Sequence, residues 1–363
     1  MTKHELWFWL VNAKGMGRKR IQILLEHFKT IEAVYQAKEE ELLSIRGIGR
    51  QCVEGLTAGK KTFQENFQKL KERKVEFLIK EDKEYPEKLK ALPDAPFALY
   101  VKGRLPFLEK RCIAIVGARD CSAYGREMAK WFARELSRAG VQVLSGMARG
   151  IDGYAHVGAI ETGAPTYAVL GCGIDICYPT EHRWIYEEMA KTGGVISEYG
   201  MGVQPLAGQF PMRNRIISAM SDGILVVEAK DRSGSLITAD YGLDLGKDIF
   251  AVPGRIGDVN SYGCNRLIKM GAYLVQKPED ILENYHFYDN SLCREHKKNN
   301  YMLETKEKIV YANLSYNPKH VNEIVVDTNL NLNETMESLI SLELKGYIKQ
   351  TMKNFYIVCN DEI

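Results

Sequence analysis

Short apolar runs alternate with stretches of helical periodicity between residues 111 and 285. The stretch 124–140, for example, places Met128, Phe132 and Leu136 on one helical face. Continuous apolar strands that alternate with helices are typical of a parallel sheet covered on both faces. The pattern therefore predicts an α/β unit with strands in the segments CIAIVGAR, VQVLSG, TYAVLGCG, GVISEYG, GILVVEA, KDIFAVPG and AYLV.

The first 60 residues contain a repeated glycine–hydrophobic–glycine pattern. Gly15-Met16-Gly17 and Gly47-Ile48-Gly49 are each followed by a basic residue and a helical stretch. This spacing is typical of helix-hairpin-helix units, in which backbone N–H groups at the following helix can face a phosphate. Two helix-joining turns in a small bundle are the alternative. Residues 1–75 are therefore predicted to form a small all-α, helix-hairpin-helix-like domain.

The segments beside these units differ in composition. Residues 61–80 predict a linking helix and a short strand, and the prolines of residues 81–106 predict an extended connector. Residues 286–304 are polar and predict a linker. Residues 305–363 show three helical stretches and a hairpin, which is the arrangement of a winged helix. Its presumed recognition helix, 333–346, carries three glutamates and one lysine, so we expect a protein contact rather than a duplex groove.

Length and composition limit the number of domains and the class of protein. A chain of 363 residues with 45% hydrophobic residues predicts roughly two to four domains. The net charge is +2, but residues 1–110 carry 22 Lys and Arg against 16 Asp and Glu, and the remainder carries 27 against 31. Eight cysteines without a C-x-x-C spacing favour neither a zinc site nor a disulfide framework. No secretory signal or long apolar segment is visible, so we expect a cytoplasmic protein without membrane contacts.

The predicted strands end in glycines, hydroxyls and arginines. Ligands of open parallel sheets gather beyond the carboxyl ends of the strands, where N–H groups and arginine favour anions. No G-x-G-x-x-G follows the first strand of the predicted unit, which disfavours a dinucleotide, and neither a cofactor nor a metal ion is expected. The strand ends therefore predict a phosphate-binding crevice formed by Gly117, Ala118, Arg119, Ser145, Gly146, Arg149, Gly150, Phe210, Arg213, Asn214, Arg215, Ser233 and Gly234.

Several of these side chains have a structural alternative. Arg213 and Arg215 are two residues apart, so one can touch a ligand while the other braces it. Arg149 can be buried against Asp152. Phe210 can pack in the core or form a platform for stacked bases, and an aromatic side chain beside arginines suits single-stranded nucleic acid.

Candidate catalytic groups are also present, and a structural role is favoured for each. Asp152 and His156 lie one helical turn apart, where they can order a loop. Cys172 lies between two glycines, with no histidine placed by the sequence to activate it. Glu198 and Glu228 end strands and can accept hydrogen bonds from loop backbone. No catalytic residue is predicted, because none of these patterns has the specificity of a named catalytic motif.

Six motifs between about residues 80 and 285 occur together in a known family. They are YPEKLKALPDAPFALYVKG, IAIVGAR, SGMARGIDGYAH, FPMRNRIIS, VVEAKDRSGSLITA and FAVPG. The chain closely resembles the bacterial DNA-processing protein A (DprA/Smf) family. The resemblance implies an extended Rossmann-like core over residues 76–285 that binds single-stranded DNA, a homodimer, and loading of the RecA recombinase during natural transformation.

The resemblance also assigns residues. It implies that Gly117-Ala118-Arg119 matches the family's Gly-Ser-Arg loop and that Arg119 contacts DNA. It places Ser145–Gly150 in the second glycine loop and Arg213–Arg215 at a basic helix start. Ala118 departs from the usual serine, which removes one hydroxyl.

Three hypotheses follow. The first is a non-enzymatic single-stranded DNA-binding protein. The second is a phosphoribohydrolase that cleaves nucleoside monophosphates on a related Rossmann-like fold, although RSGSLITAD lacks the P-G-G-x-G-T-x-x-E pattern of such enzymes. The third is a structural adaptor that works through its terminal domains.

Overall fold

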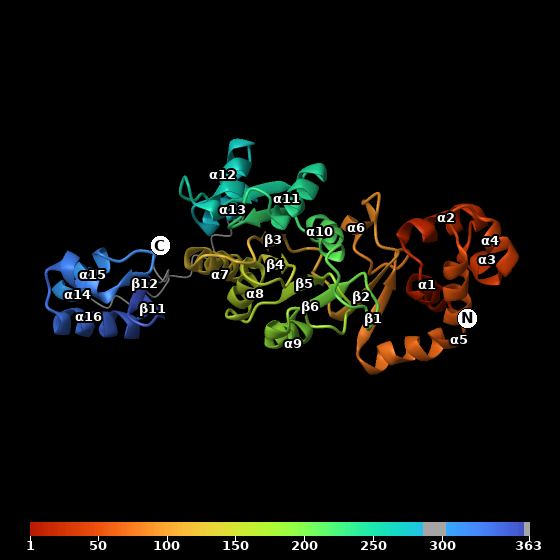
Figure 1. Ribbon diagram of the computed structural model, residues 1–363, viewed down its shortest axis with the longest axis horizontal. Coiled ribbons are helices and arrows are strands. Elements are labelled where there is room, and N and C mark those ends of the chain that lie inside the picture. The colour runs from red at the N-terminus through yellow and green to blue at the C-terminus, as the bar shows by residue number, and fades with distance from the viewer. Residues whose placement is uncertain (286–302, 359–363) are drawn as a thin grey trace.

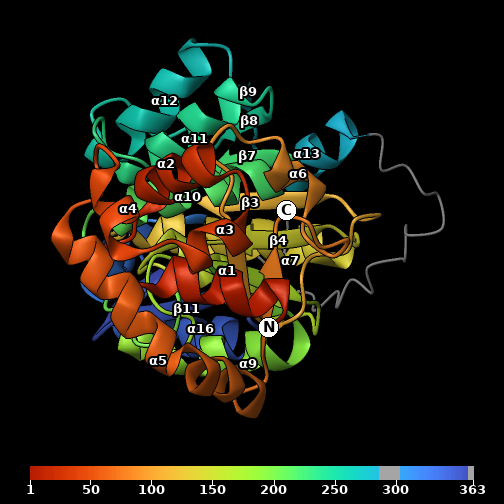
Figure 2. The same ribbon diagram turned by 90° about the vertical axis from the view of Figure 1, so that its right-hand side faces the viewer.

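The computed structural model describes residues 1–285 and 303–358. Figure 1 shows three parts in a row along the long axis: N-terminal helices, a central sheet flanked by helices, and a small C-terminal domain. Figure 2 looks along this axis from the N-terminal side, so the first five helices lie in front of the sheet. The predicted α/β class with two smaller flanking domains is confirmed.

The N-terminal part is all-α, as the glycine repeats predicted. Gly15 and Gly47 both have a positive φ, of 82° and 97°, and Gly17 and Gly49 are the N-caps of the helices that follow them. Each glycine pair therefore forms the turn of a helical hairpin. The helices are α1 (Lys3–Asn12), α2 (Arg18–Phe28), α3 (Ile31–Gln36), α4 (Glu39–Ser44) and α5 (Arg50–Glu72).

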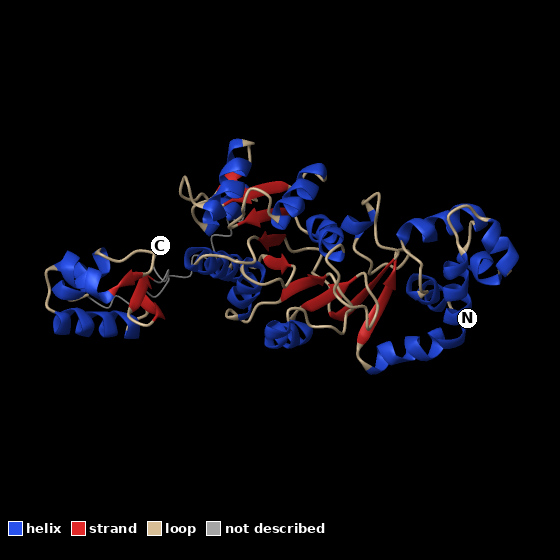
Figure 3. Cartoon of the chain, viewed as in Figure 1, coloured by secondary structure: helices blue, strands red, loops and turns tan. Residues whose placement is uncertain are grey.

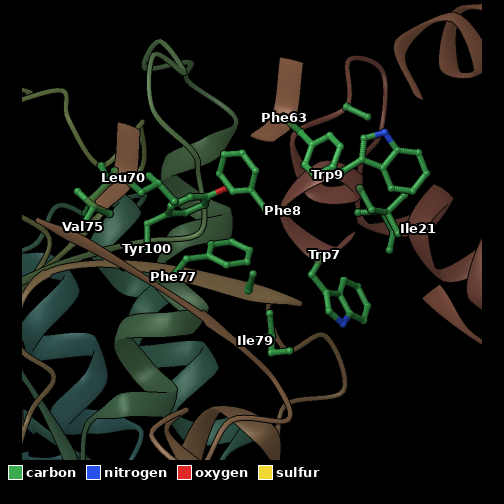
Figure 4. Close-up of a cluster of buried hydrophobic side chains, with 14 of the residues drawn as sticks. Trp7, Phe8, Trp9, Ile21, Phe63, Leu70, Val75, Phe77, Ile79 and Tyr100 are labelled. Carbon is green, nitrogen blue, oxygen red and sulfur yellow. The ribbon is translucent and has the colours of Figure 1, made fainter. Parts of the chain in front are cut away.

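An aromatic cluster joins these helices to the edge of the sheet. The ring of Phe8 in α1 lies 5.2 Å from that of Phe67 in α5 and 5.5 Å from that of Phe77 in the first strand. The Phe77 ring lies 5.1 Å from that of Tyr100 in the second strand. Figure 4 shows Phe8, Phe77 and Tyr100 together with Trp7 and Trp9. The helical domain and the sheet edge therefore share one hydrophobic core.

The central sheet has nine strands in the order β1-β2-β6-β5-β4-β3-β7-β8-β9. The seven strands from β6 to β9 in this order run parallel, whereas β1 and β2 pair antiparallel. The strands are β1 (Val75–Ile79), β2 (Ala98–Gly103), β3 (Cys112–Val116), β4 (Gln142–Ser145), β5 (Thr166–Leu170), β6 (Gly194–Ser197), β7 (Gly223–Val226), β8 (Asp248–Ala251) and β9 (Tyr273–Leu274).

The extended connector expected over residues 81–106 is wrong. This segment contains a short helix, α6 (Glu87–Lys90), and the strand β2, which pairs with β6. The prolines do not break these elements, because Pro86 is the N-cap of α6 and Pro93 and Pro96 lie in the turn before β2. The apolar run that follows Pro96 then adds a strand to the sheet.

Helices cover both faces of the sheet (Figure 3). Alternate residues of β3 point to opposite faces: Ile113 and Ile115 pack with α7 and α8, and Ala114 and Val116 pack with α10 and α11. The remaining elements of the core fill the same two layers and the loops. The helices are α7 (Ala123–Arg138), α8 (Ile151–Ile160), η1 (Thr180–His182), α9 (Arg183–Thr192), α10 (Gln209–Met220), α11 (Gly234–Asp244), η2 (Val259–Ser261), α12 (Tyr262–Lys269) and α13 (Pro278–Asn284).

The chain reverses its direction across the sheet at β3. From β3 it proceeds through β4 and β5 to β6, and then returns to pair β7 with the other side of β3. Loops that leave two such neighbouring strands diverge to opposite faces and leave a crevice between them. The fold therefore places a ligand site beyond the carboxyl ends of β3 and β7.

The C-terminal part is a winged helix, as predicted. It has a three-stranded antiparallel sheet in the order β10-β12-β11 and its own apolar core. It meets the first turns of α7, where Tyr124 and Tyr316 contact edge to face at 5.6 Å and Lys349 pairs with Glu127. Residues 286–302 of the expected linker lie outside the described residues. The elements are α14 (Thr305–Ala312), β10 (Lys319–His320), α15 (Val321–Thr328), α16 (Leu332–Leu344), β11 (Ile348–Met352) and β12 (Phe355–Val358).

Candidate nucleic-acid interface

A cleft of about 620 Å³ opens at the point where the sheet reverses. Three segments form its walls: the loop after β3, the loop after β7 and the first turns of α10. Arg119, Lys230 and Arg232 are exposed cations along its rim. The lining also includes Gly117, Ala118, Asp120, Tyr178, Phe210, Arg213, Asn214, Ser233, Gly234 and Ser235.

Arg119, Phe210 and Tyr178 form a stack on one wall of the cleft. The guanidinium carbon of Arg119 lies 5.2 Å from the centroid of the Phe210 ring. The Phe210 and Tyr178 rings lie 5.6 Å apart with an angle of 35° between their planes. Phe210 is half-buried and Tyr178 is 43% exposed. The wall thus combines a cation with two rings on which a planar base can stack.

The loops after β3 and β4 are locked together. The Ile151 N–H donates to the Ala118 oxygen at 3.2 Å, and the Ala118 N–H donates to the Glu228 oxygen at 2.7 Å. Gly150 has a φ of 73°, and a Cβ there would lie 2.2 Å from the Ala118 oxygen. Glycine is therefore required at position 150. Because Ala118 is buried and its N–H is occupied, we assign this residue to the packing of the loop.

Ser145 and Gly146 support the cleft from below and do not line its open face. The Ser145 hydroxyl is fully buried and donates to the Ile115 oxygen at 2.6 Å. The Gly146 N–H donates to the Asp152 carboxylate at 3.1 Å. The expectation that both contact a phosphate is corrected, because their polar groups already have partners inside the fold.

Arg213 is a buried brace. It is 4% exposed, and its Nη1 donates to the backbone oxygens of Gly146, at 2.6 Å, and Val169. Burial raises the pKa of the neighbouring Asp152, which the charge of Arg213 opposes. Arg213 thus ties α10 to the ends of β4 and β5, and its positive charge lies just beneath the cleft.

Arg215 does not reach the cleft. It is 1% exposed, and its guanidinium pairs with Asp94 at 3.1 Å and with Glu198 at 2.6 Å. The expected DNA contact at this position is corrected, because the guanidinium is buried and carboxylates face its Nε and Nη2. Arg215 fastens α10 to the turn before β2 and to the end of β6.

Arg149 is exposed and pairs with Glu181, which lowers the pKa of Glu181 to about 2. The alternative of burial against Asp152 is therefore wrong. Arg149 lines a smaller recess of about 40 Å³ that continues from the cleft past the rings of Tyr178 and Phe210. A second cation is thus available at the far end of the aromatic wall.

The start of helix α11 forms the opposite wall of the cleft. Ser233 is the N-cap of α11, and its hydroxyl lies 2.7 Å from that of Ser235. The Asn214 side chain donates to the Gly234 oxygen at 3.2 Å and so joins this wall to α10. Ser233, Gly234 and Asn214 therefore meet at the cleft, as the sequence predicted.

Comparison with known proteins decides the family. The profile described as DNA recombination-mediator protein A matches residues 76–286, which is more than half of the chain. The chain belongs to this family. The profiles of a SAM-like helix-hairpin-helix tandem and of the DprA winged helix domain match residues 10–57 and 297–351.

Individual members of the DNA recombination-mediator protein A family are similar over most of the chain. Protein Smf of Escherichia coli K12 is 40% identical over 278 residues, which cover 75% of this chain and 74% of that protein. The X-ray structure of DNA processing protein A from Streptococcus pneumoniae has a TM-score of 0.67 at 34% identity and covers 78% of this chain and 98% of that chain. A structure of DNA processing protein A from Helicobacter pylori, reported for its single-stranded DNA binding mode, has a TM-score of 0.53 at 29% identity. It covers 58% of this chain and 95% of that chain.

Sequence reasoning missed two cations and one ring of the cleft, Lys230, Arg232 and Tyr178. Lys230 and Arg232 immediately precede Ser233 in the segment KDRSGS, so two cations beside two hydroxyls were the available signal. Tyr178 gave no such signal, because it lies eight residues beyond the end of β5 and reaches Phe210 only through the fold.

The groups considered for catalysis are engaged in the structure. His156 does not pair with Asp152; its Nδ1 lies 2.8 Å from the Thr166 hydroxyl, and burial lowers its pKa to about 3. Burial raises the pKa of the Cys172 thiol to about 11. Glu228 accepts from the Ser122 N–H at 2.9 Å and from its hydroxyl at 2.5 Å, at the start of α7. The Cys172 thiol donates to the Ile176 oxygen at 3.4 Å, whereas the buried Nε2 of His156 has no hydrogen-bond partner among the described residues.

Proposed function

We propose that this protein binds single-stranded DNA in the cleft between β3 and β7. The stack of Arg119, Phe210 and Tyr178 carries the proposal, because bases can stack on the rings while phosphates meet the cations of the rim. Membership of a family described as a recombination mediator supports it. So does the Helicobacter pylori relative, whose structure is reported for single-stranded DNA binding.

Single strands fit this chemistry better than a duplex. In a duplex the bases are paired and stacked on one another, so their faces do not reach a protein ring. The cleft offers rings and cations, which suit the exposed faces of unpaired bases and the phosphates between them. Binding should therefore tolerate any sequence.

The family further suggests what the bound strand is for. We infer that the protein acts as a homodimer in the cytoplasm, protects incoming DNA and loads the RecA recombinase onto it. This part of the proposal rests on the resemblance to the DprA/Smf family. Among the residues that the structure describes, no helix is long and apolar enough to cross a membrane.

We infer that the cleft performs no catalysis. Asp152 lines it, but its carboxylate accepts the Gly146 N–H and faces the Arg213 charge. The loop RSGSLITAD also lacks the glutamate that nucleoside-monophosphate phosphoribohydrolases carry at the matching end. A nucleotide hydrolysis assay tests this inference directly, and release of a free base from a nucleoside monophosphate would contradict it.

The central test is a titration with labelled oligothymidylate and with a duplex of equal length at several salt concentrations. If about three phosphates are neutralised at ~0.7 per contact, the logarithm of the association constant should fall with that of the salt concentration with a slope of about −2. Equal affinity for both DNAs, or affinity independent of salt, would contradict the proposal.

A further inference from the structure

Helix α16 of the winged helix carries an apolar stripe that its own domain does not cover. Leu332, Met336, Ile340 and Leu344 follow one another at intervals of four residues along the helix. The side chains of Leu332, Ile340 and Leu344 are 53%, 51% and 84% exposed, and Met336 is partly buried. Figure 1 shows α16 along the lower edge of the C-terminal domain. We call these four residues the α16 stripe.

Met336 packs against the core of the domain, whereas Leu332, Ile340 and Leu344 do not belong to that core. Thr335, Ser338, Leu339 and Leu342 form the opposite face of α16 and are buried. They pack in the core of the domain, beside α14, α15 and β11. Both faces of the helix are therefore apolar, although burial inside the domain explains only one of them.

The charges beside the stripe are negative. Glu337 and Glu343 are exposed at different positions around the helix, both beside the stripe, and Glu343 also accepts from the Gln350 N–H at 3.0 Å. Helix α16 contains no lysine or arginine. Two lysines of the domain are engaged in ion pairs: Lys306 pairs with Glu334, and Lys345 pairs with the buried Glu307. A helix of this kind would bring carboxylates toward phosphates in a DNA groove, which is unfavourable.

The negative charges also distinguish a second copy of this chain from a different protein as the partner of the stripe. Two α16 stripes packed against each other in a symmetric pair would bring the glutamates of one copy near those of the other, which is repulsive. A partner helix with an apolar face and lysines or arginines at its edges would bury the stripe and also pair with Glu337 and Glu343. Ridges of side chains at intervals of four residues suit such helix-on-helix packing.

We propose that the α16 stripe is a docking surface for a basic amphipathic helix of a partner protein. The winged helix thereby uses its third helix, α16, to bind protein instead of duplex DNA. The proposal is independent of the cleft, because no residue of the stripe lies in α7 or in the loops that line the cleft.

The test uses the full-length protein and two fluorescent helical peptides of ~18 residues, about five turns. Both have leucines at the spacing of the stripe; one has lysines at the edges of its apolar face and the other has glutamates. The lysine peptide should bind at least about tenfold more tightly at low salt, a difference of about 1.4 kcal/mol. Equal binding of the two peptides would overturn the proposal.

Matched variants locate the site. Ile340→Ser combined with Leu344→Ser should weaken binding of the lysine peptide at least about tenfold. Glu337→Lys combined with Glu343→Lys should reverse the preference in favour of the glutamate peptide. Met352→Ser is the control, because Met352 is 60% exposed in β11 and lies outside the stripe.

Other outcomes identify other occupants and would overturn the proposal. A stripe variant that loses duplex DNA affinity would assign the surface to nucleic acid. A stripe variant that shifts to a smaller species in sedimentation would assign it to a second copy of the chain. Circular dichroism of each variant establishes that the helices are intact, and the charge-reversal pair gives a gain of binding that unfolding cannot produce.

Discussion

At the scale of the residue, two arginines of the predicted site have opposite surroundings. Arg119 is exposed and lies over the ring of Phe210, whereas Arg215 is buried between Asp94 and Glu198. The first cation is available to a ligand, and the second holds α10 in place. Substitutions at the two positions should therefore change different properties.

Arg119→Glu should weaken binding of oligothymidylate by about 2 kcal/mol or more, because a phosphate contact is replaced by a repulsion. Arg126→Glu makes the same change of charge one turn into α7, where the exposed Arg126 lies over Tyr154. It should change affinity by less than about 0.5 kcal/mol. Fluorescence anisotropy titrations measure both, and equal losses would indicate a general charge effect.

Arg215→Met should lower the free energy of unfolding by about 3 kcal/mol, because it leaves the partly buried carboxylates of Asp94 and Glu198 without their partner. Burial already raises the pKa of Glu198, and Arg215 opposes this shift. Without Arg215 the folded-state pKa of Glu198 should rise further above its unfolded value.

The effect of Arg215→Met on stability should depend on pH. A carboxyl with a raised folded-state pKa stabilises the fold when it is protonated, and this contribution is lost as the pH rises through that pKa. The loss in free energy of unfolding that Arg215→Met causes relative to the wild type should therefore be smaller at about pH 5 than at about pH 8. Urea unfolding at both pH values measures it. Adding Glu198→Gln should abolish the difference between the two pH values, and a deficit independent of pH would contradict the assignment.

At the scale of the element, the helical domain and the edge of the sheet depend on each other. Phe8 of α1 contacts Phe77 of β1 and Tyr100 of β2 in addition to Phe67 of α5. The boundary expected at residue 75 therefore crosses a continuous core. We expect α1 and the strands β1 and β2 to unfold together.

Phe8→Ala should remove about 3–5 kcal/mol of stability through the cavity that it leaves. Hydrogen exchange should then show faster exchange in α1, β1 and β2 by similar factors. Leu43→Ala is the control, because Leu43 is 44% exposed in α4, and its effect should lie within about 0.5 kcal/mol. Faster exchange confined to the N-terminal helices would show that the two parts are independent.

Periodicity predicted most elements, because each depends on local patterning. The alternating runs gave the strands β3 to β8 and the helices between them, and the glycine pairs gave the hairpins of the N-terminal domain. The strand β2 was missed because its prolines suggested a connector, although they lie outside the strand. The pairing of β2 with β6 is a long-range contact that no local pattern encodes.

The sequence predicted where the cleft lies, but it did not predict which of the residues line it and which support it from inside the fold. The rule on strand ends located the cleft and Arg119. Burial separated Arg213 and Arg215 from Arg119, and burial depends on how α10 packs against strands far away in the sequence. Ser145 was misassigned for the same reason, since its hydroxyl is satisfied by the neighbouring strand β3.

At the scale of the whole molecule, the winged helix is separated from the cleft. Its contacts with the core include Tyr124 and Glu127 of α7, whose side chains do not line the cleft. Its apolar core is its own. The two ends of the molecule should therefore carry separable activities.

A protein that ends at Glu304 should bind oligothymidylate within about tenfold of the full chain, or 1.4 kcal/mol. It should lose binding of the lysine peptide completely. Anisotropy titrations with both ligands measure this, together with a thermal unfolding curve that establishes folding of the shortened protein. A larger loss of DNA affinity in a folded shortened protein would place part of the DNA site in the winged helix.

The aromatic wall has a consequence for the thermodynamics of binding. The Phe210 ring lies against Gly171, where a Cβ would approach it to 2.8 Å, and Tyr178 and Arg119 lie against the same ring. The ring is therefore already immobilised before any ligand arrives, so little side-chain entropy remains to be lost. Most of the ordering on binding should then occur in the flexible strand. Calorimetry with DNA strands of increasing stiffness should show an entropy loss on binding that becomes smaller as the strand becomes stiffer. The substitution Gly171→Ala displaces the Phe210 ring and should weaken the binding of every strand by a similar factor.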